Sequence, residues 1–231
     1  MAFKTVAFVF VVLILAVSAR AQQKPEYDMG LMQMLLLSRA PEWKDAGRAQ
    51  ALGKEHKAYV LNLVKEGRVA LWGEVRGEDE LREVMVFKTG SPEEARAAAQ
   101  LLPAVKAGWL KPSVLSWYAA RNLIKERQLP VTQSDYIFGI LVRGPRWTKE
   151  VTDETKKIQE GHLANINRLA EAGKLVLAGP FEDGGERRGV FIFKVGTVEE
   201  AQALTQTDPA VIAGRLKIEL HRWSVPKGML P

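Results

Sequence analysis

The sequence predicts an α+β fold of two ferredoxin-like units, each with the order β-α-β-β-α-β, packed sheet to sheet within one chain. The first observation is an internal repeat: a shift of 106 positions aligns residues 56–117 with 162–223 without a gap, and 25 of the 62 aligned positions are identical. The second is that each copy alternates short apolar runs with helix-like amphipathic stretches. The third is that two apolar runs in each copy lack the polar alternation of a strand with one face in water.

The repeat defines the predicted domain organisation. A period this long indicates duplicated domains rather than a solenoid of short repeats. We expect one unit at residues 27–120 and a second at 135–228, joined by a polar linker at 121–134. The pairs of identical residues include His56/His162, Gly67/Gly173, Gly73/Gly179, Phe87/Phe193, Pro103/Pro209, Gly108/Gly214 and Trp117/Trp223.

Each unit is read as four strands and two helices from its periodicity and its turn residues. In the second unit we expect strands at 136–144, 174–179, 189–195 and 215–223, and helices at 152–172 and from Thr197 onward. Thr197 followed by Glu200 is typical of a capping box at a helix start. The first unit repeats this order, with strands at 29–38, 69–73, 82–88 and 113–119 and helices at 44–66 and 91–102.

The first and third strands of this topology lie at the centre of the sheet. Here both are continuously apolar, as in "LMQMLLL" and "VMVF" of the first unit and "YIFGILV" and "VFIF" of the second. Strands of this kind are covered on both faces, but the helices of the unit cover only one. We therefore expect the other unit to cover the second face, in a sandwich or a barrel.

The N-terminus has the pattern of a secretory signal peptide, which we place at residues 1–21. Lys4 precedes an apolar run over residues 6–17, and Ala19-Arg20-Ala21 forms a cleavage site for signal peptidase. The run is too short for a membrane span of about 20 residues. The protein is therefore expected to be exported, either periplasmic or secreted, with no membrane anchor after cleavage.

The charge distribution excludes a nucleic-acid partner. The formal net charge of +6 falls to +4 when Lys4 and Arg20 are removed with the signal peptide. The remaining basic residues are interleaved with acidic ones and form no block of five. Nucleic-acid and membrane surfaces require clustered positive charge.

Several kinds of chemistry are missing from the sequence. The chain has no cysteine, which excludes disulfides, thiolate metal sites and cysteine nucleophiles. The dinucleotide-binding, P-loop, serine-hydrolase and zinc-protease motifs do not occur either. We therefore expect no cofactor.

Two of the three histidines occupy equivalent positions in the repeat. His162 lies on an apolar helix stripe with Ile158 and Ile166, and His56 lies on the equivalent stripe of the first unit, so both should face the sheet. For a single histidine this pattern favours a core residue bonded to a backbone carbonyl over a functional one. The second copy does not decide between them, because duplication copies structural and functional residues alike.

The second unit resembles the YCII-related (YciI-like) family. The resemblance rests on "GHLANINRLAEAGKLVLAGPF" and "EEAQALTQTDPAVIAGRLKIELHRW": a helix histidine, a glycine before the second strand, Gly-Pro after it, and Asp-Pro before the last strand. It covers residues 136–224, and a degenerate form covers 29–118. It implies a dimeric α+β-barrel fold, which the duplication would supply as an intrachain pseudo-dimer, either monomeric or as a homo-oligomer.

The resemblance also implies a site. The family's His–Asp pair corresponds to His162 and Asp208, in a pocket between sheet and helices beside the Gly179-Pro180 turn. One relative is a dehydrochlorinase of chlorinated hydroxyquinols, and related barrels include muconolactone isomerase. The implied function is a cofactor-independent lyase or isomerase acting on a small oxygenated ring compound, with His162 and Asp208 catalytic. The alternative is a non-catalytic barrel that binds a small ligand or is only structural.

Asp208 has a second reading that the sequence leaves open. Asp-Pro is also an ordinary helix start, with the aspartate as N-cap and proline at the first helical position. At the equivalent positions of the first unit, Leu102 replaces the aspartate and Glu74 replaces the proline of Gly-Pro. We therefore expect His56 to lack a carboxylate partner and to be structural or to serve binding only.

His221 is the third histidine and corresponds to Leu115 of the first unit. It shares a strand face with Glu219 and Trp223, and we expect a surface or inter-sheet position, with a binding role left open. His162, Asp208 and His221 are of types that suit a divalent metal. Their spacing does not require one, and we expect no metal.

Overall fold

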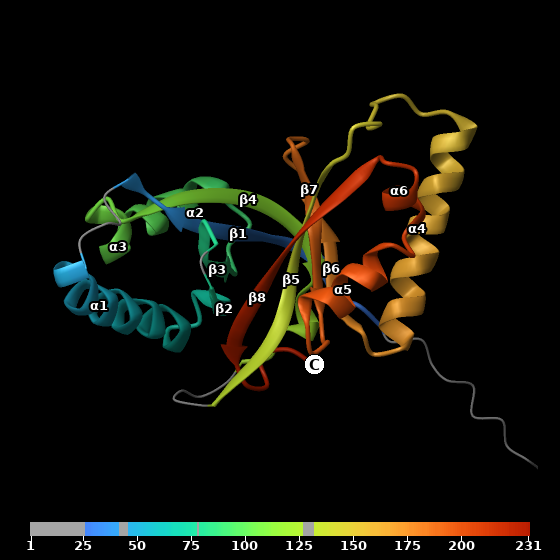
Figure 1. The fold of residues 1–231 in the computed structure, drawn as a ribbon. Helices are drawn as coiled ribbons and strands as arrows, with labels where there is room; N and C mark the ends of the chain where they lie inside the picture. The colour runs from blue at the N-terminus through green and yellow to red at the C-terminus, as the bar shows by residue number, and fades with distance from the viewer. Residues whose placement is uncertain (1–25, 42–45, 78, 127–131) are drawn as a thin grey trace, which may run out of the picture.

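The computed structural model describes residues 26–41, 46–77, 79–126 and 132–231 (Figure 1). The predicted signal peptide, at residues 1–21, lies outside the described residues. Within them, no helix is both long and apolar enough to cross a membrane. The chain forms two units of the same topology, and Figure 1 shows their helices on opposite sides of the strands.

The two units contain corresponding elements. The first unit comprises β1 (Met29–Arg39), α1 (Ala46–Lys65), β2 (Val69–Val75), β3 (Leu81–Phe87), α2 (Pro92–Gln100), α3 (Pro103–Lys106) and β4 (Leu110–Ala120), followed by the 3-10 turn η2 (Arg121–Leu123). The second comprises β5 (Gln133–Arg143), α4 (Asp153–Glu171), β6 (Leu175–Pro180), β7 (Arg187–Phe193), α5 (Val198–Thr205), α6 (Pro209–Ile212) and β8 (Leu216–Pro226). The predicted β-α-β-β-α-β order is confirmed, with one short extra helix after the second helix of each unit.

The strands form one antiparallel eight-stranded sheet in the order β4-β1-β3-β2-β8-β5-β7-β6. The first and third strands of each unit are central in their half, as predicted. The halves join at β2 and β8, where Val75 pairs with Trp223. The free edges meet at the equivalent place, where Phe181 forms a bridge with Trp117 and Glu182 N–H donates to Ser116 O at 2.9 Å. The sheet is therefore a nearly closed barrel, which decides between the two arrangements left open by the sequence.

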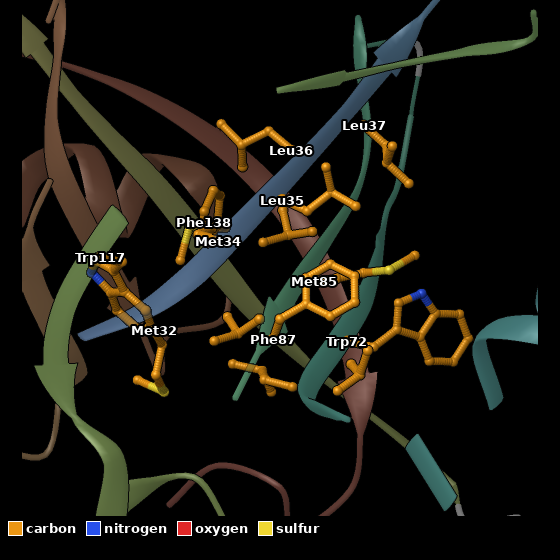
Figure 2. Close-up of a cluster of buried hydrophobic side chains, with 14 of the residues drawn as sticks. Met32, Met34, Leu35, Leu36, Leu37, Trp72, Met85, Phe87, Trp117 and Phe138 are labelled. Atoms are coloured by element: carbon orange, nitrogen blue, oxygen red, sulfur yellow. The ribbon is translucent and has the colours of Figure 1, made fainter. Parts of the chain in front are cut away.

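The two faces of each strand serve different contacts. In β1, Met34 and Leu36 lie on one side of the ribbon and Leu35 and Leu37 on the other (Figure 2). Residues of both units share one core cluster, which includes Met34 and, from β5, Phe138. This contact is the physical reason why the central strands carry no polar alternation: each lies between its own helices and the other unit.

Glycine and tryptophan pack against each other at both joints of the barrel. A Cβ on Gly73 would lie 2.4 Å from Trp223 Nε1, and one on Gly179 would lie 2.2 Å from Tyr118 O and 2.8 Å from Trp117 Nε1. Only glycine allows backbone and indole to approach this closely. Gly73 aligns with Gly179 in the repeat, and Trp117 aligns with Trp223, so the two units contribute the same residues to both joints.

The helix starts differ in detail from the prediction. Thr197 caps α5, with its side chain accepting Glu200 N–H, but the Glu200 carboxylate accepts the N–H of Gly196 rather than that of Thr197. Only half of the predicted capping box therefore forms. A reciprocal box forms instead at α4, between Thr152 and Thr155.

Candidate functional site

The structure brings His162 and Asp208 into contact. α4 carries His162 over the outer face of the sheet, where its ring stacks on Phe191 of β7 with centroids 5.8 Å apart and 17° between the planes. His162 Nδ1 lies 2.7 Å from Asp208 Oδ2. The imidazole side chain is 13% exposed and the carboxylate is fully buried.

Asp208 is both the N-cap of a helix and the partner of His162. It is the N-cap of α6, and its Oδ1 accepts the N–H of Ala210 at 2.9 Å, while Oδ2 faces His162. The helix cap therefore fixes the carboxylate in one orientation. Because an ionised carboxylate can only accept hydrogen bonds, Nδ1 of His162 carries the proton in this contact. In the neutral ring this leaves the lone pair on Nε2, for which the described residues offer no partner.

A cavity of about 990 Å³ lies beside the pair, between α4, the strands β6 and β7, and the segment 147–151 that leads into α4. His162 and Phe191 line it, and so do Gly179 and Pro180 at the predicted turn. The other lining residues include the apolar side chains of Leu141, Ile166, Ala178 and Leu216. They also include the charged side chains of Lys149, Glu150, Lys156, Glu160, Arg188 and Arg215, which we call the rim.

Two substitutions between the repeats explain why this space is open in the second unit. The positions equivalent to Ala178 and Gly189 are Trp72 and Glu83 in the first unit. There both side chains extend under α1 and meet, since Trp72 Nε1 donates to Glu83 Oε2 at 3.1 Å. The side chains of Trp72 and Glu83 therefore fill this space in the first unit. In the second unit the small residues Ala178 and Gly189 leave it open.

The expectation that His56 lacks a carboxylate partner was wrong. Leu102 does replace the aspartate and caps α3 without a side-chain hydrogen bond, but Glu83 of β3 supplies a carboxylate from another direction. His56 Nε2 lies 3.2 Å from Glu83 Oε2, and its Nδ1 accepts the N–H of Ala104 at 3.4 Å. Both ring nitrogens are engaged and the residue is 4% exposed, so this geometry fits a structural histidine.

His221 lies apart from the cavity. On β8 it contacts Asp79 of the β2–β3 turn, with 2.8 Å between Nδ1 and Oδ2, and so connects the two units. The position agrees with the expected inter-sheet placement, and the binding role stays a prediction. His162, Asp208 and His221 do not come together, and the described residues hold no cluster of three or more His, Cys, Asp or Glu side chains suited to a metal ion.

Arg188 and Trp147 line the cavity but were missed in the sequence. The Arg188 guanidinium lies 5.5 Å from the centre of the Trp147 ring, and Arg143 lies 3.9 Å from the same ring. A signal existed, because Arg188 is one of the identities of the repeat, with Arg82 as its counterpart. The direction of the Arg188 side chain depends on a β-bulge in the β5–β7 pairing, which the sequence does not reveal.

These features define a class of protein: a duplicated ferredoxin-like barrel in which one unit carries a His–Asp pair beside an open cavity. Residues 144–224 match the model of the YCII-related domain. This match covers most of the second unit. The same segment is similar to the uncharacterized protein YjpA of Bacillus subtilis (strain 168), with 27% identity over 81 residues, which are 33% of this chain and 93% of that protein.

Solved structures share the fold over nearly the whole chain. A chlorite dismutase mutant from Candidatus Nitrospira defluvii has a TM-score of 0.55 and 9% identity, covering 86% of this chain and 91% of its own. A heme-binding protein from Thermus thermophilus has a TM-score of 0.52 and 12% identity, covering 88% and 94%. At such identities the likeness shows the fold alone.

Proposed function

We propose that the second unit is an acid–base site for a small oxygenated ring compound, acting as a lyase or isomerase without a cofactor. The observation that carries this is the 2.7 Å contact between His162 Nδ1 and the buried, capped Asp208 beside the cavity. A carboxylate on Nδ1 holds one tautomer and stabilises the imidazolium that forms when Nε2 takes a proton. The first unit lacks this free nitrogen.

The chemistry that follows is a proton transfer at Nε2. His162 removes a proton from a ring carbon or a ring hydroxyl of the bound compound, and Asp208 stabilises the resulting cation. In a dehydrochlorination the electrons of the broken C–H bond form a new C=C bond and chloride leaves. In an isomerisation the imidazolium returns the proton to a different carbon. Neither reaction requires an oxidant or a reductant.

Exchange of protons with solvent tests this role before the natural substrate is known. Chlorinated hydroxyquinols and unsaturated lactones are incubated with the protein in deuterated water, and deuterium incorporation and chloride release are followed by NMR and ion chromatography. We expect His162→Ala and Asp208→Asn to lower the rate by about 100-fold or more, the usual contribution of a general base. His56→Gln should leave it unchanged in protein that remains folded. A His162→Ala variant as active as wild type would contradict the proposal.

Ligand binding is the alternative to acid–base catalysis, and one observation favours a heme as the ligand. A histidine that donates Nδ1–H to a buried carboxylate and leaves Nε2 free is the usual arrangement of a metal-bound imidazole. Structures that share the fold include a heme-binding protein. The residues fit a heme: His162 would hold the iron, the cavity has about 990 Å³, and Lys149, Arg188 and Arg215 at its rim suit propionate groups. A bound heme would supply redox chemistry.

Titration with hemin distinguishes heme binding from the acid–base role. If the cavity holds heme, wild type gives a saturable Soret band that His162→Ala shifts or abolishes, while His56→Gln and His221→Gln retain it. An identical spectrum for wild type and His162→Ala shows adventitious binding and leaves the acid–base role as the proposal.

We also propose export, on the grounds of Lys4, the apolar run at 6–17 and Ala19-Arg20-Ala21. Protein recovered from outside the cytoplasm should begin at Gln22 in N-terminal sequencing. Full-length protein confined to the cytoplasm would refute it.

A further inference from the structure

We propose that the cavity binds a small planar carboxylate, such as an aromatic acid, with its carboxylate on Arg188 and its ring beside the His162–Phe191 stack, at the Nε2 edge of His162. This inference names the ligand class of the proposed acid–base site and rests on that function for its biological meaning. It stands on three features of the second unit: a β-bulge, a guanidinium without an acidic partner, and the presence of Arg188 and His162 in the lining of the same cavity.

The bulge places Arg188 at the cavity. Along the β5–β7 pairing, Leu141 faces Gly189 and Val142 faces Arg187, so Arg188 is an extra residue with no partner of its own. A bulge of this kind redirects a side chain relative to the strand alternation. Arg187 donates to Ser113 of β4, whereas Arg188 lines the cavity.

The charge of Arg188 has no acidic partner among the described residues. Its one hydrogen bond within the protein is long, 3.5 Å from Nη1 to Gly185 O, and Trp147 contributes a cation–π contact. Of the other basic groups that line the cavity, Arg215 donates twice to Thr148 and Lys156 pairs with Asp153, while the exposed Lys149 has no side-chain partner among the described residues. Arg188 is therefore a guanidinium at the cavity with donors to spare, and a guanidinium can bind a carboxylate in a two-point contact.

The dimensions suit a single ring. Arg188 and Phe191 are three residues apart on β7, a separation of about 10 Å along a strand. His162 stacks over Phe191, so its Nε2 and the guanidinium border the same stretch of β7. Two small residues, Gly189 of β7 and Ala178 of β6, also line the cavity. A ring of six atoms with one carboxylate spans this interval, and its ring carbons reach His162.

Benzoate is the probe for this inference, and benzyl alcohol is its uncharged match. Binding to the full-length mature protein is measured by calorimetry for wild type, Arg188→Gln, Arg188→Lys and the control Arg82→Gln. Arg82 occupies the equivalent bulge of the first unit, where it donates to Gly77 O, so this control removes the same charge from a place without the cavity. His162→Ala separates ligand binding from proton transfer.

We expect wild type to bind benzoate at least about 10-fold more tightly than benzyl alcohol, because a charge-assisted contact contributes that much or more. Arg188→Gln should lose this preference, Arg188→Lys should retain part of it, and Arg82→Gln should behave as wild type. His162→Ala removes a side chain that borders the ligand, so it should weaken the binding of both probes, but it should keep the preference for benzoate because that preference depends on Arg188.

The inference is overturned if Arg188→Gln binds benzoate as wild type does, if benzyl alcohol binds equally well, or if wild type shows no benzoate binding. Failure of the acid–base function looks different: benzoate binding would depend on Arg188 as expected, while His162→Ala would leave proton exchange unchanged. The two ideas can therefore fail separately.

Discussion

At the scale of single residues, two equivalent histidines differ because of their neighbours. His162 donates to a carboxylate on one side and leaves Nε2 toward a cavity, whereas His56 has both nitrogens bonded to the protein. The difference originates in Trp72 and Glu83, which fill the space that Ala178 and Gly189 leave open. A buried polar group without a partner costs about 1–3 kcal/mol, so filling this space required a partner such as Glu83 for the His56 nitrogen that faces it.

Substitutions at the equivalent positions 72 and 178 should therefore affect different properties: ligand binding for Ala178 and stability for Trp72. Ala178→Trp should fill the cavity and abolish benzoate binding in protein that remains folded. Trp72→Ala should lower the free energy of unfolding by about 3–5 kcal/mol, the cost of a large cavity in a core, without affecting benzoate binding. Urea denaturation and calorimetry measure the two effects. Benzoate affinity retained in Ala178→Trp would show that the ligand lies elsewhere.

Tyr136 links stability to alkaline pH. Burial raises the pKa of the Tyr136 phenol, and its hydroxyl donates to the main-chain oxygens of Leu230 and Pro231. A raised pKa means that the fold favours the protonated form. This contribution to stability is complete below the unfolded value near pH 10 and is lost as the pH rises through the folded value.

Tyr136→Phe should therefore be less stable than wild type near pH 7, by about 0.5–1.5 kcal/mol for the lost hydrogen bonds. Between about pH 9 and 11 its stability should fall less steeply than that of wild type. Urea denaturation across this range is the measurement, with Tyr118→Phe as the exposed control. Parallel pH curves for Tyr136→Phe and wild type would refute the link.

At the scale of elements, the site depends on where strands depart from regularity. The bulge in β7 directs Arg188 to the cavity, and the cap of α6 fixes Asp208 beneath α4. Gly179, which the resemblance placed at the site, has a further role: it lets β6 approach Trp117 of β4 and close the barrel. The strand β6 thus both closes the barrel and forms part of the cavity wall.

Gly179→Ala should destabilise the protein, because the new methyl group would lie 2.2 Å from Tyr118 O, a backbone atom that cannot move freely. Overpacking of this kind costs about 1–3 kcal/mol. Gly196→Ala is the control, since a Cβ there meets nothing within 4 Å. Thermal and urea denaturation should show a loss for Gly179→Ala that Gly196→Ala does not share. Equal stability of the two variants would mean that the joint tolerates a side chain.

At the scale of the whole molecule, the repeat predicted most of the architecture. The unbroken apolar strands indicated a second covering layer, and the structure confirms that the other unit provides it. The partner of His56 was missed because Glu83 comes from a strand, while the sequence comparison looked only at the position of Asp208. The resemblance implied the cavity, but the residues that open it were missed for a related reason. Ala178 and Gly189 align with Trp72 and Glu83 in the repeat, but the effect of these differences is evident only when all four residues are known to face the helices. Arg188 was missed because its orientation is set by a bulge.

The central claim is that only the second unit carries an open site, and the three histidines report on it directly. In protein labelled with ¹⁵N-histidine, each imidazole gives its own pair of nitrogen signals, which His56→Gln and His162→Gln assign. Addition of benzoate should shift the His162 Nε2 signal, while the signals of His56 and His221 stay in place. A shift of the His56 signals as large as that of His162, or no shift of His162 at saturating benzoate, would contradict the account.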